Sequence, residues 1–206
     1  AAEAINAAKR PVLYVGGGAI LANAWKEVRE LAQKANVPCT TTLLGLGAFD
    51  EHDPRSLRML GMHGAAYANY AVQESDCLIA IGARFDDRVT GNLKLFAPKA
   101  RIVHIDIDPS SISKNVKVDI PVVGDARLCL RDIIEHVQHV ERPDWFEQID
   151  QWKRQFPFTF LDDSPNTKPQ AVIHAMNTIT PGQAVFATGV GQHQMWAAQF
   201  IRWTHP

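Results

Sequence analysis

The pattern that most constrains this fold is a series of short apolar runs, each followed by glycine or charge and separated by helical segments. Clear examples are residues 11–15 (PVLYV), which stop at Gly16-Gly17-Gly18, residues 76–82 (DCLIAIG) and residues 101–106 (RIVHID). Strands that are apolar on both faces are typical of a sheet buried between two layers of helices. We therefore predict an α/β fold with a doubly wound, open parallel sheet of Rossmann type and right-handed crossovers.

Weaker signals add further elements to this alternation. Residues 37–43 (VPCTTTL) and 120–123 read as strands, and residues 64–74 read as a helix. Two amphipathic helices follow from apolar residues at helical spacing. Their buried faces are predicted to consist of Val28, Leu31, Ala32 and Ala35, and of Leu130, Ile133, Ile134 and Val137. Asn23 is the expected cap of the first, which should end near Asn36.

The alternation of strand and helix patterns stops after residue 140. We predict a first domain over residues 1–140 and a linker over residues 141–167 that carries a surface helix at 144–155. Residues 168–206 are expected to begin a second α/β unit, with a helix at 169–179 and a strand at 184–188 (AVFAT). Because the chain ends in mid-pattern at IRWTHP, we expect this unit to be truncated and the 206 residues to be a fragment.

Composition excludes several classes of protein. Lys and Arg number 21 against 22 Asp and Glu, so there is no global basic field to hold nucleic acid or an anionic membrane. Cys39, Cys77 and Cys129 offer neither a disulfide framework nor a metal knuckle, and no apolar stretch is long enough to cross a bilayer. We expect a reducing compartment: the cytoplasm in a bacterium, an organelle in a eukaryote.

Polar residues cluster where the predicted strands end. In a parallel sheet these ends meet at one edge, which is the usual ligand site of such folds. Glycines there let the backbone approach a phosphate, arginines neutralise it, and carboxylates accept hydrogen bonds from ribose hydroxyls. The sequence thus favours a dinucleotide site, although the G-x-G-x-x-G pattern of nicotinamide sites fails at Leu21.

Each of these signals has a plainer alternative. The glycines at 16–18 can be only a turn, and the charges at 84–88 can be a solvated salt-bridge cluster. Asp106 and Asp108 can both cap a turn; we favour a ligand role for Asp106 and a cap for Asp108. His63 favours packing or a helix start over a metal, and His104 is expected to face a helix. We predict no metal ligands in this chain.

Five motifs carry a family resemblance that covers nearly the whole chain. They are LGMHGAAYANYAV (60–72), GARFDDRVTG (82–91), VHIDIDP (103–109), GDA (124–126) and TGVGQHQMWAAQF (188–200). Together they resemble the catalytic subunits of acetohydroxyacid synthases, also called acetolactate synthases, which use thiamine diphosphate. In that family residues 1–140 correspond to the middle domain, which binds FAD, and the part from about 168 begins the domain that holds thiamine diphosphate.

The resemblance also implies the contacts of individual residues. The implied FAD contacts are Gly17, Gly18, Thr42, Leu43, Leu60, Gly61, Met62, His63, Gly82, Ala83, Arg84, Asp86, Arg88, Val89, Asp106, Ile107, Asp125 and Ala126. The implied thiamine diphosphate contacts are Val190, Gly191, Gln192 and His193, whose alternative role is a plain strand-to-helix turn. No catalytic residue is expected in this chain, because the family's activating glutamate and its metal-holding GDG…N segment have no counterpart here.

The activity that the resemblance implies belongs to a longer parent protein. It is the decarboxylation of pyruvate and transfer of the two-carbon unit to a second 2-oxoacid, with thiamine diphosphate and Mg²⁺ as cofactors and FAD in a structural role. Implied partners are 2-oxoacids, further catalytic subunits in a homo-oligomer, and in some members a regulatory subunit. Two alternatives stay open: a sister enzyme such as glyoxylate carboligase or pyruvate oxidase, and a free-standing nucleotide-binding module.

Overall fold

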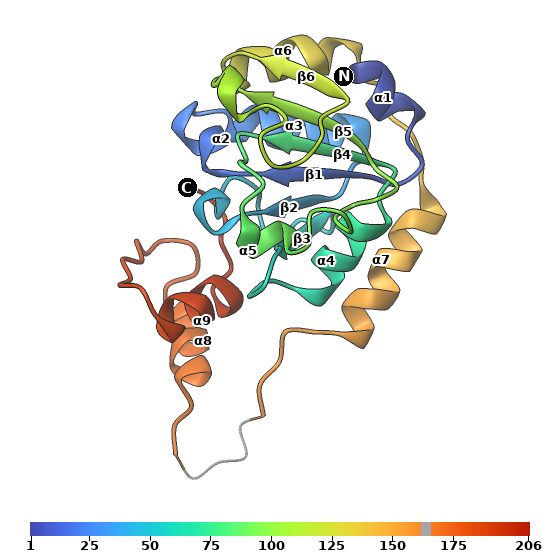
Figure 1. Ribbon diagram of the computed structural model, residues 1–206. Coiled ribbons are helices and arrows are strands. Elements are labelled where there is room, and N and C mark those ends of the chain that lie inside the picture. The colour runs from blue at the N-terminus through green and yellow to red at the C-terminus, as the bar shows by residue number, and fades with distance from the viewer. Residues whose placement is uncertain (162–165) are drawn as a thin grey trace.

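The centre of the protein is an open, twisted parallel sheet. The computed structural model describes residues 1–161 and 166–206, and in these residues the sheet has six strands in the order β3-β2-β1-β4-β5-β6. The strands are β1 (Pro11–Val15), β2 (Cys39–Thr41), β3 (Ser56–Met59), β4 (Cys77–Ile81), β5 (Arg101–Asp106) and β6 (Ile120–Val123). The order reverses between β1 and β4, so the predicted doubly wound fold is confirmed (Figure 1).

Helices cover both faces of this sheet (Figure 1). One face packs against α1 (Ala2–Ala7), α2 (Gly17–Leu21), α3 (Trp25–Ala35) and α6 (Ala126–His136). The other packs against α4 (Ala66–Glu74) and α7 (Pro143–Gln155). Neighbouring strand residues point to opposite faces, so Val12 and Leu13 enter different cores, and both are fully buried. This is why the run PVLYV is apolar throughout.

The predicted helix after the first strand is confirmed, but its cap is not. Val28, Leu31, Ala32 and Ala35 are all buried, and α3 ends at Asn36 in the left-handed conformation with φ 52°. Asn23 does not cap the helix: the N-cap is Ala24, and the Asn23 side chain accepts a hydrogen bond from the Trp25 indole at 3.0 Å. Asn23 itself is left-handed, with φ 52°, one residue too early to cap.

Two strand predictions need correction. The segment 37–43 forms only three strand residues and then a 3-10 turn, η1 (Leu43–Gly45), which Thr42 caps by accepting a hydrogen bond from the Gly45 N–H. The edge strand β3 was not predicted at all, because its four residues, SLRM, are too short a run to be distinguished from the loop around them. Within this strand Arg58 has φ 59°, where the register between β2 and β3 is irregular.

Helix α7 lies in the segment that the sequence marked as a linker. It is not confined to the surface, because Trp145 and Ile149 are buried in the same core as Tyr14 and Leu78. The Trp145 indole donates a hydrogen bond to the Pro11 carbonyl at 3.2 Å. These contacts join α7 to the sheet unit, whereas a domain boundary at residue 140 stays a prediction.

The C-terminal part contributes α8 (Pro169–Ile179) and α9 (Gln192–Phe200), which pack against each other (Figure 1). The predicted strand at 184–188 is wrong. These residues form no strand, and Val185 is almost fully exposed, because no neighbouring strand in the described part of the chain is available to pair with them. None of the helices in the described residues is both long enough and apolar enough to span a bilayer.

Candidate ligand site at the carboxyl edge of the sheet

The six strand ends lie side by side along one edge, joined by backbone hydrogen bonds beyond the strands themselves. The N–H groups of Leu60, Thr42, Gly16, Gly82 and Gly124 each donate to the strand next to their own, at 2.9–3.2 Å. The predicted FAD contacts therefore follow one another along this edge. Their spatial order is 60–63, 42–43, 17–18, 82–89, 106–107 and 125–126.

Glycines close the junction between β1 and β4, where the winding reverses. A Cβ on Gly16 would lie 2.2 Å from the Gly82 carbonyl oxygen, and one on Gly18 would lie 2.7 Å from the Gly82 Cα. Gly82 has φ +55°, and its carbonyl accepts the Gly18 N–H at 3.0 Å. These glycines are thus required by the approach of two turns, and the Gly18 N–H is already engaged there.

The charged segment after β4 is held from below by an aromatic cluster. Phe85 is buried with φ 54° and packs edge-on against Tyr14 and His104, at centroid distances of 5.5 and 5.0 Å. Above it, the exposed Arg84 guanidinium lies 3.3 Å from the Asp86 carboxylate. The predicted salt bridge is therefore present in this segment, and the ligand role of its charges stays a prediction.

Asp86 also starts the short helix α5 (Asp87–Thr90) by accepting the Arg88 N–H. Hydrogen bonding from Asp87 lowers the pKa of the Asp86 carboxyl, and the Arg88 N–H and Arg84 add to this. The Arg88 side chain borders a cavity of about 540 Å³ together with Leu60, Met62 and other residues of both loops. The cavity is thus shared by two segments that the sequence analysis assigned to one ligand.

Asp106 is set at the end of β5 above a buried histidine. Its Oδ1 accepts the Asp108 N–H at 2.9 Å, and its Oδ2 lies 3.7 Å from His104 Nε2. His104 lies on β5, as predicted, and is fully buried against Phe85 of the loop after β4. Burial lowers the pKa of His104, and the nearby Asp106 carboxylate opposes this.

Two further acids act as caps. The Asp108 carboxylate accepts the Ser110 N–H at 2.9 Å at the start of η2 (Pro109–Ser111), as predicted. Asp125 accepts the Leu128 N–H at 3.1 Å and so caps α6. A ligand contact from Asp125 would therefore have to come from its remaining oxygen or from the neighbouring backbone.

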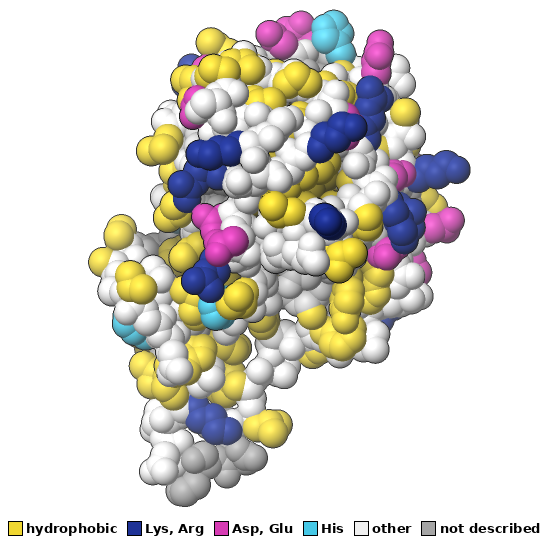
Figure 2. All heavy atoms as spheres, in the orientation of Figure 1, with side chains coloured by type: hydrophobic (Ala, Val, Ile, Leu, Met, Phe, Trp, Pro, Cys, Tyr) yellow, Lys and Arg dark blue, Asp and Glu magenta, His cyan; other side chains and the backbone are white. Residues whose placement is uncertain are grey.

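Large apolar side chains stand exposed along the same edge. Leu44 is 72% exposed and Met62 is 65% exposed at the β2 and β3 end, and Ile107 is 71% exposed at the β5 end. Arg84 lies between these two apolar groups in the order of the strands, whereas Arg88 lies beside Met62, whose N–H donates to the Arg88 carbonyl at 2.8 Å. Figure 2 shows apolar, basic and acidic side chains interspersed over the sheet unit.

The remaining predicted residues, 190–193, begin α9 in the C-terminal part, where Val190 is exposed. The other end of α9 contacts the sheet unit, because Gln199 donates a hydrogen bond to the His63 carbonyl at 2.8 Å. One residue that sequence reasoning missed is Asn69 of α4. Its side chain accepts the Gly61 N–H at 2.8 Å and donates to the Gly61 carbonyl at 3.0 Å, which fixes the loop after β3.

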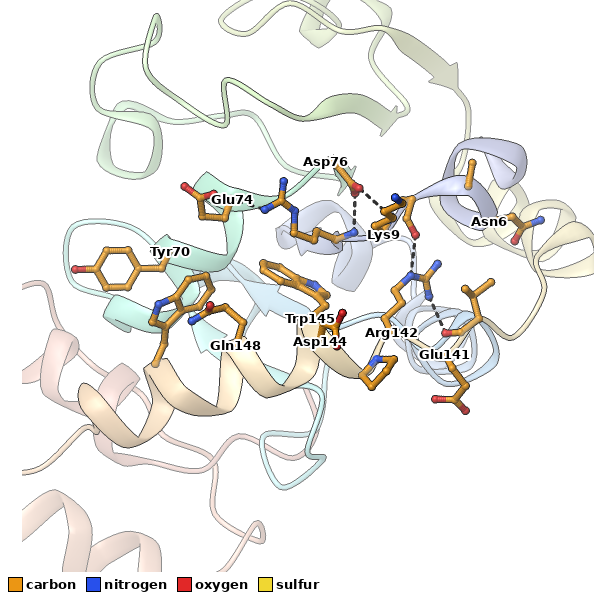
Figure 3. Close-up of a pocket in the computed structure, with 16 residues that line it drawn as sticks. Asn6, Lys9, Tyr70, Glu74, Asp76, Glu141, Arg142, Asp144, Trp145 and Gln148 are labelled. Atoms are coloured by element: carbon orange, nitrogen blue, oxygen red, sulfur yellow. Dashed lines mark hydrogen bonds and ion pairs between the residues drawn. The ribbon is translucent and has the colours of Figure 1, made fainter.

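A larger cavity, of about 880 Å³, lies at the opposite edge, between α7 and residues 6–10 (Figure 3). Two of its polar side chains, Asp76 and Arg142, hold the backbone in place. The Asp76 carboxylate accepts the N–H groups of Lys9 and Arg10 at 2.8 Å, and the Arg142 guanidinium binds backbone carbonyls. Parallel sheets bind ligands at their carboxyl edge, so that edge is the candidate ligand site despite its smaller cavity.

The described residues include no candidate metal site, and their two buried thiols are not activated. No group of three or more His, Cys, Asp or Glu side chains in these residues is placed to hold a metal ion. Cys39 and Cys77 are free and buried, as predicted, and burial raises the pKa of the Cys77 thiol to about 12. Such thiols are poor nucleophiles.

Comparison with known proteins gives one family and a consistent set of relatives. Residues 1–133 match the family described as the thiamine pyrophosphate enzyme, central domain. The acetolactate synthase large subunit of Parasynechococcus marenigrum is 52% identical over 98% of this chain. The mitochondrial acetolactate synthase catalytic subunit of Saccharomyces cerevisiae is 47% identical over 100% of it, and acetolactate synthase 1 of Zea mays is 45% identical over 98%. The chain spans about a third of the length of each relative.

Proposed function

Because the chain belongs to the family of thiamine pyrophosphate enzyme central domains, we propose that it forms the central part of an acetolactate synthase. The family implies thiamine diphosphate and Mg²⁺ in the complete enzyme. The reaction that we propose joins two 2-oxoacids with loss of carbon dioxide, and its electron sink is thiamine diphosphate. The substrates, a homo-oligomeric assembly and a regulatory partner are likewise proposals, supported by relatives of which the chain spans a third.

We further propose that the carboxyl edge of the sheet binds FAD. The observation that carries this is the order of groups along the edge: exposed Leu44 and Met62 with Arg88 beside Met62, then Arg84, then Asp106 with exposed Ile107. Adjacent strands are spaced by about 4.8 Å, so the edge extends over roughly 24 Å. An extended dinucleotide has the matching arrangement, with an apolar ring system at each end and a diphosphate between them.

The residues of this chain would divide the binding work by chemistry. Arg84 and Arg88 would neutralise the diphosphate, and the Asp106 carboxylate would accept hydrogen bonds from ribose hydroxyls. Asn69 positions the Gly61 loop, and Phe85 supports the arginine segment from the core. We propose that the flavin has a structural role, in which it orders these loops.

The test is a titration of the 206-residue chain with FAD, followed by flavin fluorescence. We expect Arg84→Ala to weaken binding about tenfold, equivalent to about 1.4 kcal/mol. The matched control is Arg101→Ala, an exposed arginine at the amino-terminal end of β5, which should bind as the parent chain does. Equal affinity of all three proteins would refute the site, and failure of the parent chain to bind FAD would refute the ligand.

The activity needs a separate measurement on the longer protein that contains this chain. We expect acetolactate from pyruvate and no oxygen consumption. Oxygen consumption with pyruvate would instead identify an oxidase of the same architecture.

A further inference from the structure

A second, smaller cavity lies at the β3 edge of the sheet, away from the proposed flavin site. Its volume is about 250 Å³, and its wall includes Glu51, Arg58, Tyr67, Lys153 and Arg202. These residues come from the turn before β3, from β3, from α4, from α7 and from the segment after α9. The β3-edge cavity thus forms where the C-terminal part meets the sheet unit.

Three cations stand in this wall. Arg58 is 7% exposed; its Nε donates to Glu51 Oε2 at 3.1 Å and its Nη2 donates to the Gln199 carbonyl. The Arg202 guanidinium has no hydrogen-bond or ion-pair partner in the part of the chain that the structure describes. Burial lowers the pKa of Arg202, and the nearby positive charge of Arg58 lowers it further. The third cation, Lys153, donates to the Pro54 carbonyl at 2.8 Å.

The carboxyl groups of the wall do not balance these charges. Asp53 is engaged by Arg55 through both oxygens, at 2.9 and 2.7 Å. Glu51 Oε1 is buried and lacks a hydrogen-bond partner among the described residues. Burial raises the pKa of Glu51 to about 7, although Arg58 and Arg202 oppose the shift. Lys153 also lies 4.0 Å from the Asp150 carboxylate, outside the wall, so the unbalanced positive charge of the wall is that of Arg202.

Once Glu51 is protonated, the cavity has three hydrogen-bond donors: the Glu51 hydroxyl, the Arg202 guanidinium and the Tyr67 hydroxyl. Neither the Glu51 hydroxyl nor the Arg202 guanidinium has an acceptor among the described residues. Burial raises the pKa of Tyr67, and Arg58 and Arg202 oppose this, so the hydroxyl also faces both arginines. We propose that the β3-edge cavity binds a small oxyanion, either a free ion or the phosphate group of a larger molecule, between Arg202, Arg58 and the Glu51 carboxyl. Bidentate contact with arginine suits such anions.

Binding there would connect the C-terminal part to the sheet unit, because Arg202 follows α9 whereas Arg58 and Glu51 belong to the sheet unit. It would also be linked to protonation of Glu51. A bound anion next to Glu51 favours the protonated carboxyl, so by reciprocity affinity rises as the pH falls. The groups that face Glu51 are Arg58, Arg202 and the Trp203 backbone; the other titratable groups of the wall are Tyr67, Lys153 and Asp53.

The test measures sulfate binding to the 206-residue chain by calorimetry, against sodium chloride of equal ionic strength. Sulfate keeps its charge over the pH range used. We expect saturable binding that is about tenfold weaker in Arg202→Gln and unchanged in Arg154→Gln. The control residue is an exposed arginine of α7 that pairs with Glu147 at 3.1 Å. We expect affinity to fall severalfold from pH 6.5 to pH 8.

Glu51→Gln separates the binding role from a merely structural one. The amide can still donate a hydrogen bond, so this variant should bind sulfate but lose the pH dependence. Inorganic phosphate and O-phosphoserine are compared last: equal binding assigns the cavity to phosphate groups in general, and binding of phosphate alone assigns it to the free ion. The proposal is overturned if sulfate binding does not saturate, or if Arg202→Gln binds as the parent chain does. Neither result bears on FAD.

Discussion

Replacement of Arg142 by alanine should cost far more stability than its place in the predicted linker suggests. The side chain is 5% exposed, and no carboxylate pairs with it in the described residues. Its guanidinium instead donates to five backbone carbonyls at 2.7–3.3 Å. They belong to Ile5, Ala8, Ala35, Asn36 and Val140, and so join α1, the end of α3 and the start of α7. Figure 3 shows Arg142 at the start of α7.

The size of the expected loss in the free energy of unfolding depends on how many of these carbonyls are buried from water. The bonds to Ile5, Ala8 and Ala35 are buried, whereas those to Asn36 and Val140 are part-buried beside the 880 Å³ cavity. Each buried carbonyl that loses its partner costs at least about 1 kcal/mol. We therefore expect Arg142→Ala to lower the free energy of unfolding by about 3 to 4 kcal/mol.

Urea denaturation followed by circular dichroism and tryptophan fluorescence measures this difference. The control is Arg154→Ala on the exposed side of α7, where loss of a solvent-exposed ion pair should cost less than about 1 kcal/mol. If Arg142→Ala costs no more than the control, the guanidinium is not a structural centre, and the start of α7 behaves as the linker that the sequence suggested.

Three further predictions concern stability. Gly16→Ala should cost more than about 2 kcal/mol in thermal denaturation, because the new Cβ would lie 2.2 Å from the Gly82 carbonyl. Gly189→Ala, with no contact under 3.5 Å, should cost much less, and equal losses would contradict the packing argument. Asp125→Ala should cost about 1 kcal/mol and Asp125→Asn much less, since asparagine also caps; equal losses would argue against capping. For Glu51, the folded pKa of about 7 exceeds the unfolded value, so the parent chain should lose stability relative to Glu51→Gln from pH 5 to pH 8; a constant difference would contradict this.

The sequence predicted those parts of the fold that depend on local pattern. β1, β4 and β5 are apolar on both faces because helices cover both faces of the sheet. Each of these strands can therefore be recognised from its own residues alone. β3 was missed because it is a short run and because the partners of its buried Arg58 are not neighbours in the strand. Arg58 pairs with Glu51, seven residues earlier, and donates hydrogen bonds to the Gln199 and Ile201 carbonyls, 141 and 143 residues later. A local pattern contains no sign of such partners.

The wrong prediction of a strand at residues 184–188 also arose because a local pattern contains no information on distant partners. Residues 184–188 have the composition of a strand, but a strand exists only when another pairs with it, and the described residues provide none. At the candidate site, glycines and charges at strand ends could be located from sequence. Their individual roles could not: Gly18 meets Gly82 across the β1–β4 junction, and Asp125 caps a helix.

Hydrogen exchange of the chain with and without FAD compares the two edges of the sheet in one experiment. We predict that FAD slows exchange of backbone amides in the strand-end segments 16–18, 42–47, 60–64, 82–91, 106–108 and 124–126. Residues 6–10 and 143–152, which border the larger cavity at the opposite edge, should exchange as before. Slower exchange around that cavity, with none at the strand ends, would contradict the assignment of the carboxyl edge as the flavin site.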